Sequence, residues 1–308
     1  MPNEETILKR SLVAIMMVAC LGIAFGIVSG SFAILFDGVF SLVDAAMTIL
    51  SLIVARLIAR ATVADGLPER LHRQFSTGFW HLEPLVLLLN ATILLAVTTY
   101  AIFSAVMSLF AGGRSMDFGP AMVYAAVVVI ISIVMGWYEH RANRQIKSDF
   151  VRMDVHGWVM AGGVTLSLLI AFAIGFALDG TGYAWLLPYV DPLVLLLVGL
   201  ALLPIPIGTL RKAAAEVLQI TPDDLLSEVE RVAETVTTEQ SFSGHRAYVA
   251  RAGRGTQIEL YFIVPKDQPP RALEEWDALR DRIGTAISGD PRHRWLTIAF
   301  TTDPARAN

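Results

Sequence analysis

Residues 36–50 read FDGVFSLVDAAMTIL, and they place two carboxylates, Asp37 and Asp44, within an apolar segment at 32–59. A segment of about 20 apolar residues spans the hydrocarbon core of a bilayer. A carboxylate at that depth costs about 2.5 to 3.5 kcal/mol on insertion scales, so it usually faces a bundle interior or a water-filled path. Asp37 precedes Asp44 by seven residues, which is about two helical turns and nearly the same helix face. We therefore expect both acids to face one cavity that carries an ion or a proton.

The composition of the chain is that of a membrane protein. Of its 308 residues, 55% are hydrophobic and 17% are charged. The mean hydropathy of +0.57 is well above that of ordinary soluble domains. The apolar excess lies between residues 11 and about 210, whereas residues 211–308 are rich in charge. We predict two domains, a transmembrane domain at 1–210 and a cytoplasmic domain at 211–308.

Six stretches are long enough to cross a bilayer. They are 11–29, 32–59, 83–110, 119–140, 153–178 and 190–208. The first follows Lys9 and Arg10, as the apolar core of a signal peptide would. Its apolar core is long, however, and no clear cleavage site follows it, so we expect a retained helix. The sequence therefore predicts a membrane α-helical bundle of six transmembrane helices.

Basic residues are concentrated in the connections after the second, fourth and sixth spans. They are Arg56, Arg60, Arg70, Arg73, Arg141, Arg144, Lys147, Arg152, Arg211 and Lys212. The other connections are poor in positive charge, with only Arg114 after the third span. The positive-inside rule then places both termini in the cytoplasm. We expect an integral protein of the cell (inner) membrane.

The charge and the motifs exclude several classes of function. The net charge is −4, and no basic stripe interleaved with aromatic residues is present, so we expect no nucleic-acid partner. The single cysteine, Cys20, lies in the first span, where we expect it to pack as a small apolar residue. No nucleophile elbow, phosphate loop or zinc-protease motif is present, so we expect neither an enzyme nor a resident cofactor.

The segment after residue 220 has the pattern of a small α+β domain. A helix start at 221–224 precedes apolar residues at helical spacing. Two strand-like runs, HRAYVARA and TQIELYFIV, are separated by the glycine-containing turn at 253–255. An amphipathic helix at 272–287 and a strand WLTIAFTT follow. The order αββαβ predicts a ferredoxin-like cytoplasmic domain in which both helices cover one face of a three-stranded sheet.

Six spans with cytoplasmic ends, acids in the second span and an αββαβ tail together resemble the cation diffusion facilitators, a family of proton-coupled divalent-metal exporters. DGVFSLVDA at 37–45 is similar to the family's stretch in which a small or acidic residue precedes a serine, a leucine and an aspartate. FSTGFWHLEPL at 75–85 is similar to the loop in which a glycine stands five residues before a glutamate, here Glu83. The resemblance covers nearly the whole chain. It implies a homodimeric secondary transporter that exports a divalent metal cation in exchange for protons.

The sequence departs from the family's membrane metal site at three positions. The resemblance implies a His or Asp four residues before the aspartate of the second span, and a His and an Asp at the same spacing in the fifth. Asp44 is present, but Phe40, Gly157 and Ala161 stand at the other positions. A tetrahedral zinc site needs about four N, O or S ligands. We therefore do not expect the usual zinc geometry.

The acids that remain follow one another along the predicted path between the second and fifth spans. Asp37 is expected toward the outer side, Asp44 near the midplane and Asp154 toward the cytoplasmic mouth. Asp37 and Asp44 are about 10 Å apart along a helix axis, which favours separate, hydrated stations over one cage. Carboxylate and water ligands suit Mg, Mn or Ca better than softer ions.

Each candidate ligand also has a structural alternative. Asp44 could bond to a neighbouring hydroxyl, Asp37 could be solvated near the outer interface, and Asp154 could cap the fifth span. His156 could supply an imidazole or titrate as a proton-coupling group, or simply lie at the membrane interface. Glu83 could form an entry site with the neighbouring histidine or pair with the arginine-rich loop.

The main rival function is a non-transporting membrane scaffold or metal sensor that retains the fold with a degenerate ion site. In the tail, His245 and Asp303 match two of the family's cytoplasmic metal positions, whereas Tyr261 and Thr301 replace others. The resemblance therefore implies at most half of a tail metal site.

Overall fold

The structure is a computed structural model that describes residues 4–61, 79–146, 149–253, 255–289 and 291–307. The chain forms two compact units. The first unit comprises Met1–Leu50 and Leu89–Thr209, and the second comprises Ser51–Leu88 and Leu210–Asn308. The division into a transmembrane domain at 1–210 and a cytoplasmic domain at 211–308 stays a prediction.

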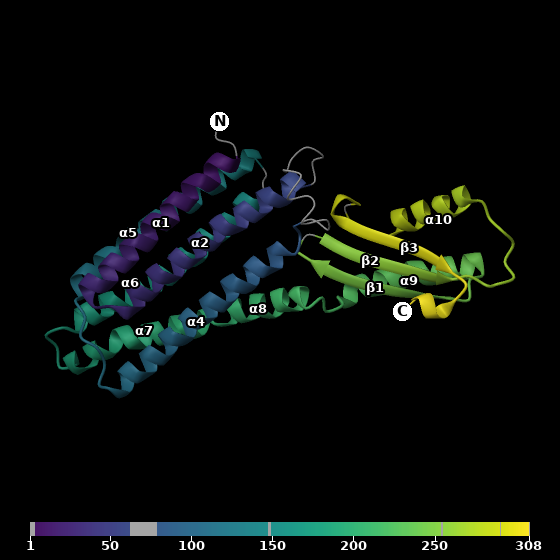
Figure 1. The fold of residues 1–308 in the computed structure, drawn as a ribbon. Helices are drawn as coiled ribbons and strands as arrows, with labels where there is room; N and C mark the ends of the chain where they lie inside the picture. The colour runs from purple at the N-terminus through teal and green to yellow at the C-terminus, as the bar shows by residue number, and fades with distance from the viewer. Residues whose placement is uncertain (1–3, 62–78, 147–148, 254, 290, 308) are drawn as a thin grey trace. The chain divides into compact units, whose positions relative to one another are not determined.

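Long apolar helices make up most of the chain. They are α1 (Glu4–Ser29), α2 (Phe32–Ala61), α4 (Leu82–Phe110), α5 (Phe118–Ile146), α6 (Asp149–Leu178), α7 (Leu187–Leu202) and α8 (Pro204–Val217), as labelled in Figure 1. Within the described ranges, six helical segments are long and apolar enough to cross a membrane, which confirms the six predicted spans. Apolar side chains such as Phe103, Ile133 and Leu197 are exposed, as expected where a helix faces lipid.

The sixth span is longer than predicted and is divided at a proline. It extends over Ala184–Val217 rather than 190–208, and it joins a short 3-10 turn at Ala184–Leu186 to α7 and α8. Pro204 opens α8, because proline lacks an N–H and is favoured at the first position of a helix. The N–H of Leu203 still donates to the Gly199 carbonyl at 2.9 Å. The predicted end was too early because the chain stays helical after its composition becomes polar at Arg211.

A buried acid ties the start of α2 to α7. Asp191 is 0% exposed, and its carboxylate accepts hydrogen bonds from the hydroxyl of Ser31 and from the N–H groups of Phe32 and Ala33. Two of these donors are N–H groups of the first turn of α2, which have no partner within their own helix. Asp191 thus acts as a long-range N-terminal cap, although the sequence places it in the sixth span.

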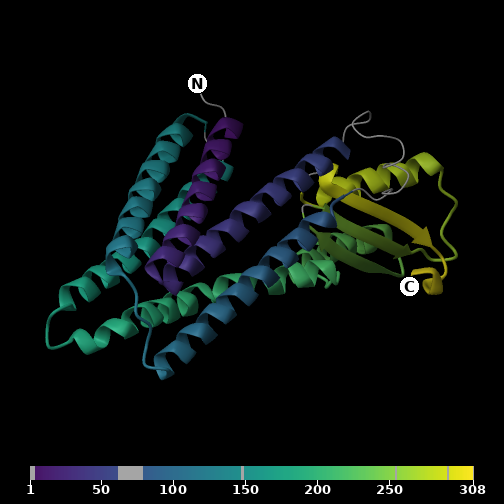
Figure 2. The ribbon, with the colours of Figure 1, turned by 60° about the vertical axis from the view of Figure 1, so that its left-hand side comes forward.

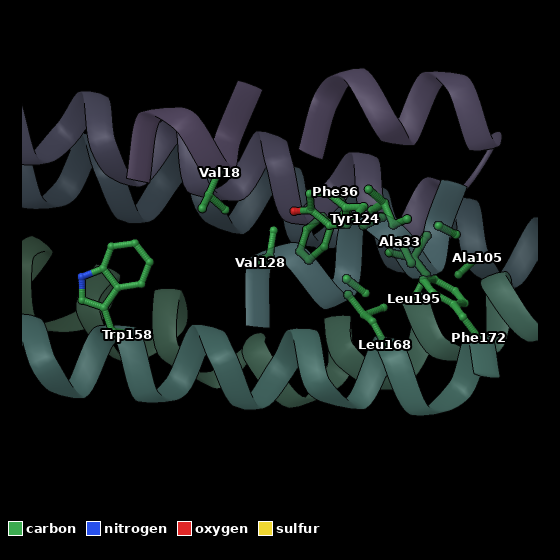
Figure 3. Packing of buried hydrophobic residues seen from close by; sticks show 14 residues of the cluster. Val18, Ala33, Phe36, Ala105, Tyr124, Val128, Trp158, Leu168, Phe172 and Leu195 are labelled. Carbon is green, nitrogen blue, oxygen red and sulfur yellow. The ribbon is translucent and has the colours of Figure 1, made fainter. Parts of the chain in front are cut away.

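Helices α1, α5 and α6 pack against one another in the first unit, as Figures 1 and 2 show. Figure 3 shows the buried cluster of this unit, which includes Phe36 of α2 and Tyr124 of α5 and has Trp158 of α6 at one end. Ring contact between Phe25 and Tyr124, with centroids 6.1 Å apart, adds α1 to this cluster. The packed core therefore reaches the helix face of α2 that carries the first predicted acid.

Two glycines set the distance between α1 and α2. A Cβ added at Gly38 would lie 2.6 Å from the backbone nitrogen of Ile23, and one added at Gly22 would lie 2.6 Å from the Gly38 Cα. Real Cβ atoms do not approach backbone atoms so closely, so both positions require glycine while the helices stay in place. Small residues allow such close packing in membranes. Because Gly38 follows Asp37, the contact also fixes the orientation of the acidic face.

The tail has the predicted order of helices and strands. It consists of α9 (Asp223–Gln240), β1 (Gly244–Ala252), β2 (Gly255–Ile263), α10 (Leu273–Ala286) and β3 (Arg294–Thr301), with short 3-10 turns at Pro291–His293 and Pro304–Ala307. The strand order is β1-β2-β3, where β1 and β2 are antiparallel and β2 and β3 are parallel.

One hydrophobic core joins both tail helices to the sheet. Val229 of α9 and Ile283 of α10 pack in the same cluster as Ile258, Leu260 and Phe262 of β2. These three β2 residues alternate along the strand and therefore point to one face. The prediction that both helices cover a single face of a three-stranded sheet is confirmed.

Candidate cation site

A cavity of about 230 Å³ lies within the first unit and is lined by the three aspartates Asp37, Asp44 and Asp154. Residues of α1, α2, α5, α6 and the sixth span surround it. A water molecule occupies about 30 Å³ in the liquid, so the cavity has room for a hydrated cation. The structure thus brings together the three acids that lie along the predicted path.

Asp37 is the most firmly held of the three. The hydroxyl of Tyr124 donates a hydrogen bond of 2.7 Å to its Oδ2 atom, and the tyrosine itself is 1% exposed. The contact joins α2 to α5, while the adjacent Gly38 packs against α1. A phenol can donate to a carboxylate without neutralising it. Asp37 is therefore positioned as a charged or protonatable group with one donor supplied by the protein.

Asp44 lies two turns further along α2 and is exposed at the cavity. Ser41, less than one turn before it, lines the same cavity. Asp154 of α6 is close enough to repel the Asp44 carboxylate electrostatically. Two like charges that share a cavity are stabilised by a cation or by a proton on one of them. The pair therefore favours either a cation in the cavity or a proton on one of the two carboxylates.

Asp154 is not the N-terminal cap of its helix. Helix α6 begins at Asp149, so Asp154 lies in its second turn, where the N–H groups already have partners within the helix. Its side chain is half-buried, and its Oδ2 atom has no hydrogen-bond partner among the described residues. The alternative interpretation as a cap is wrong because the helix starts earlier than the predicted span at 153. Asp154 instead faces the cavity.

His156 and Glu83 lie apart from the three aspartates. Neither is among the residues that line the cavity. His156 is exposed, and its Nδ1 atom lies 2.7 Å from the carbonyl oxygen of Arg152, one turn earlier. Glu83 is in the first turn of α4 and belongs to the second unit, while residues 75–78 of its motif lie outside the described ranges. A metal role for either residue stays a prediction.

The positions that lack family ligands face the same cavity. Phe40, Gly157 and Ala161 all line it, so the helices present the expected positions but without N, O or S side-chain atoms. Throughout the described part of the chain, no three His, Cys, Asp or Glu side chains converge closely enough to hold one metal ion. The geometry is that of separated carboxylates around a shared cavity that is large enough to hold water.

Several polar residues near the cavity were missed by sequence reasoning. Ser132 of α5 and Thr165 of α6 line the cavity, and no described residue provides a hydrogen-bond partner for the Ser132 hydroxyl. Hydroxyl groups are common in membrane helices, so the sequence alone gives no signal for them. Glu139 does carry a signal, because it is an acid within the predicted span at 119–140, close to its cytoplasmic end. It lies beside Asp154.

The tail positions do not assemble a metal site within the described residues. The Nδ1 atom of His245 lies 3.0 Å from the Thr237 hydroxyl, and the Oδ1 atom of Asp303 accepts the N–H of Ala305 at 3.1 Å. Both side chains therefore have local protein partners. Tail metal binding stays without structural support.

Membrane-length helices around a cavity lined by carboxylates are the arrangement expected of a membrane cation transporter. The family model described as the cation efflux transmembrane domain matches residues 8–218. The chain therefore belongs to the cation efflux family, the cation diffusion facilitators, as the resemblance in sequence indicated.

A curated relative covers most of the chain. Over 278 residues the chain is 24% identical to the zinc transporter ZitB of Pectobacterium atrosepticum, which corresponds to 89% of this chain and 79% of that protein. The chain is thus an integral membrane protein of a family that transports metal cations out of the cytoplasm.

Proposed function

We propose that this protein is a secondary transporter that exports a divalent metal cation from the cytoplasm in exchange for protons. The observation that carries the proposal is the cavity that Asp37, Asp44 and Asp154 line. Of these three acids, Asp44 stands at a position where the resemblance implies a membrane metal ligand. The cation is the transported substrate and enters at Asp154, passes Asp44 and leaves past Asp37. A dication favours the deprotonated carboxylates, so its arrival releases protons and its departure allows them to return.

The proposed substrate is a hard divalent cation such as Mg²⁺, Mn²⁺ or Ca²⁺. The cavity offers carboxylates and hydroxyls, has room for water, and lacks imidazole or thiolate ligands among the described residues that line it. Oxygen ligands suit these ions. The similarity to a zinc transporter makes Zn²⁺ the principal competitor. Transport assays should therefore compare both kinds of ion.

The proposed setting is the inner membrane, with both termini in the cytoplasm and two copies forming a homodimer. The orientation follows from the concentration of basic residues after the second, fourth and sixth spans. Arg70, Arg73 and Lys147, which contribute to this pattern, lie outside the described residues. The dimer is inferred from the family resemblance and from the compact tail.

A membrane scaffold or metal sensor is the second candidate. It is favoured by Phe40, Gly157 and Ala161, which face the cavity without ligand atoms. A scaffold needs the fold and the tail but no saturable cation site. The two functions therefore differ in flux and in metal binding.

Proteoliposomes that contain a metal-responsive dye can separate them. We expect flux of at least one divalent cation to depend on an imposed pH gradient and to fall strongly in Asp44→Asn. Asp179→Asn is the matched control, because Asp179 is an exposed carboxylate outside the cavity. Equal flux in wild type and Asp44→Asn, or flux indifferent to the pH gradient for every ion that moves, would contradict the proposal. Absence of saturable binding would favour the scaffold.

A further inference from the structure

Glu139 of α5 is a buried acid without the partners that such a group requires. It is 0% exposed, and neither carboxylate oxygen has a hydrogen-bond partner among the described residues. Charged side chains are almost never fully buried unless they are paired or bind a metal. Asp191 is equally buried but accepts three hydrogen bonds. The difference shows that Glu139 is not simply another capping acid.

The packing of α5 against α6 places Glu139 beside Asp154. A Cβ at Gly136 would lie 3.7 Å from the Trp158 Cβ, and one at Gly162 would lie 3.0 Å from the Ser132 Cβ. In both pairs the residue number rises along α5 as it falls along α6, so the two helices are antiparallel. One further turn of α5 in the same register brings Glu139 level with Asp154. The two carboxylates are close enough to affect each other electrostatically.

Ser11 of α1 is a third polar residue at this pair of carboxylates. It is 1% exposed, and it lies next to both Glu139 and Asp154. Its Oγ atom accepts the N–H of Trp158 at 2.8 Å. A hydroxyl has one proton to donate, so Ser11 can serve at most one carboxylate oxygen. The pair is left with more acceptors than the described residues around it supply donors.

The arginine of α1 forms its hydrogen bond with a residue outside this pair. Arg10 precedes Ser11, and its guanidinium donates to the hydroxyl of Tyr138 at 2.6 Å. Tyr138 is the neighbour of Glu139 in sequence, but the contact is exposed. Among the described residues, the groups that act on the Glu139 carboxylate are Asp154, Ser11 and Trp158. None of them carries a positive charge.

We propose that Glu139 and Asp154, with the hydroxyl of Ser11, form a second binding site for a divalent cation beside the cavity that contains Asp44. Two carboxylates and a hydroxyl provide only oxygen ligands, which favour Mn²⁺, Mg²⁺ or Ca²⁺ over softer ions. The unpartnered oxygens of Glu139 point to the ligand, because a cation would satisfy both. The inference rests on the proposed transport function, since Asp154 belongs to both sites. It adds Glu139 as a station that precedes Asp44 on the way out.

The test measures Mn²⁺ binding to the purified full-length protein. Electron paramagnetic resonance monitors the concentration of the free ion. We expect wild type to have two classes of Mn²⁺-binding site. Asp44→Asn should lose one class and keep the other, Glu139→Gln should weaken the second class by about tenfold or more, and Asp154→Asn should weaken both. Asp179→Asn should bind as wild type does. Glu139→Asp, which retains the charge, should recover part of the binding lost in Glu139→Gln.

The outcomes separate this inference from the proposed function. Unchanged Mn²⁺ binding in Glu139→Gln overturns the second site, and so does an Asp44→Asn protein that binds no Mn²⁺ at all. The Asp44→Asn result keeps the test valid even where a substitution at Glu139 prevents folding. If Asp44→Asn leaves both binding and flux unchanged while Glu139→Gln abolishes binding, the transport path through Asp44 fails and the second site stands.

Discussion

The hydroxyl of Tyr124 donates a 2.7 Å hydrogen bond to Asp37, and this bond links the acidic face of α2 to the core of α5. Tyr124 is one of the largest fully buried side chains in the first unit. Its position is therefore set by packing rather than by its bond to Asp37. Asp37 therefore points to a fixed place at the cavity. A ligand held in this way loses less conformational entropy when a cation binds.

Tyr124→Phe tests this positioning. The ring and its contact with Phe25 remain, but Asp37 loses its donor, which typically costs about 1–3 kcal/mol for a buried acceptor. We expect a lower melting temperature and a several-fold weaker cation affinity with the protein still folded. Tyr138→Phe is the control, because Tyr138 accepts an exposed hydrogen bond from Arg10. Equal affinity in both variants would show that the bond does not position Asp37.

Gly38→Ala tests the close packing of α1 and α2. The added methyl group would lie 2.6 Å from the Ile23 nitrogen, and backbone atoms on both sides prevent an easy adjustment. Overpacking typically costs about 1–3 kcal/mol, so we expect a clear fall in melting temperature. Gly157→Ala is the matched control within the cavity wall, because its added Cβ meets nothing within 4 Å. Its melting temperature should stay close to that of wild type.

The sequence predicts the six spans and the αββαβ tail because each depends on local patterns. Span length and apolar composition identify the helices, and glycine spacing identifies the β1–β2 turn. The common cavity of Asp37 and Asp44 was predictable because both acids lie on one helix at a spacing of seven residues. Asp154 was predictable only through the family resemblance, which pairs the second and fifth spans.

Features that depend on packing between helices were not predictable. Nothing in the sequence states that Glu139 and Asp154 adjoin, because that contact depends on the register of α5 against α6. The role of Asp191 in capping α2 joins residues about 160 positions apart. The sixth span was predicted too short because hydropathy reports composition, whereas the helix continues into the polar residues after Arg211.

Asp191→Ala tests the long-range cap. The substitution removes the acceptor of the Ser31 hydroxyl and of the Phe32 and Ala33 N–H groups. Loss of a capping side chain costs about 0.5–2 kcal/mol in water-soluble hosts, and the buried setting adds the cost of unpartnered donors. We expect a lower melting temperature but unchanged cation binding per folded molecule, measured on the size-exclusion peak. A loss of binding without a loss of stability would assign Asp191 to the site instead.

The contact between α9 and the loop after α10 gives the tail a dependence on pH. The Glu228 carboxylate accepts the N–H of Ser288 at 2.7 Å, and hydrogen bonding from Ser288 holds the pKa of Glu228 below its ordinary value. A group with a lowered folded-state pKa stabilises the fold above its unfolded-state value, and that stabilisation is lost as the pH falls through the folded-state value.

We therefore expect faster hydrogen exchange in residues 279–288 as the pH falls below the ordinary Glu228 value of about 4.5, after correction for the intrinsic exchange rate. Glu228→Gln should exchange faster already at neutral pH and should show a smaller pH dependence. Glu230→Gln, an exposed acid on the same helix, is the control. A Glu228→Gln profile that matches wild type at every pH would exclude this contact as the cause.

Restoring the missing ligands tests whether the cavity is the family's metal site. Gly157 and Ala161 line it, and a Cβ at Gly157 meets nothing within 4 Å, so Gly157→His with Ala161→Asp can add an imidazole and a carboxylate near Asp44. Nitrogen and oxygen ligands at close range suit Zn²⁺. We expect calorimetric titration to show at least about tenfold tighter Zn²⁺ binding, which is about 1.4 kcal/mol. Gly163→His is the control, because its position is equally open but lies outside the cavity lining. Since the gain requires Asp44, adding Asp44→Asn to the double variant should remove it; a gain that survives that change would place the new zinc site elsewhere on α6.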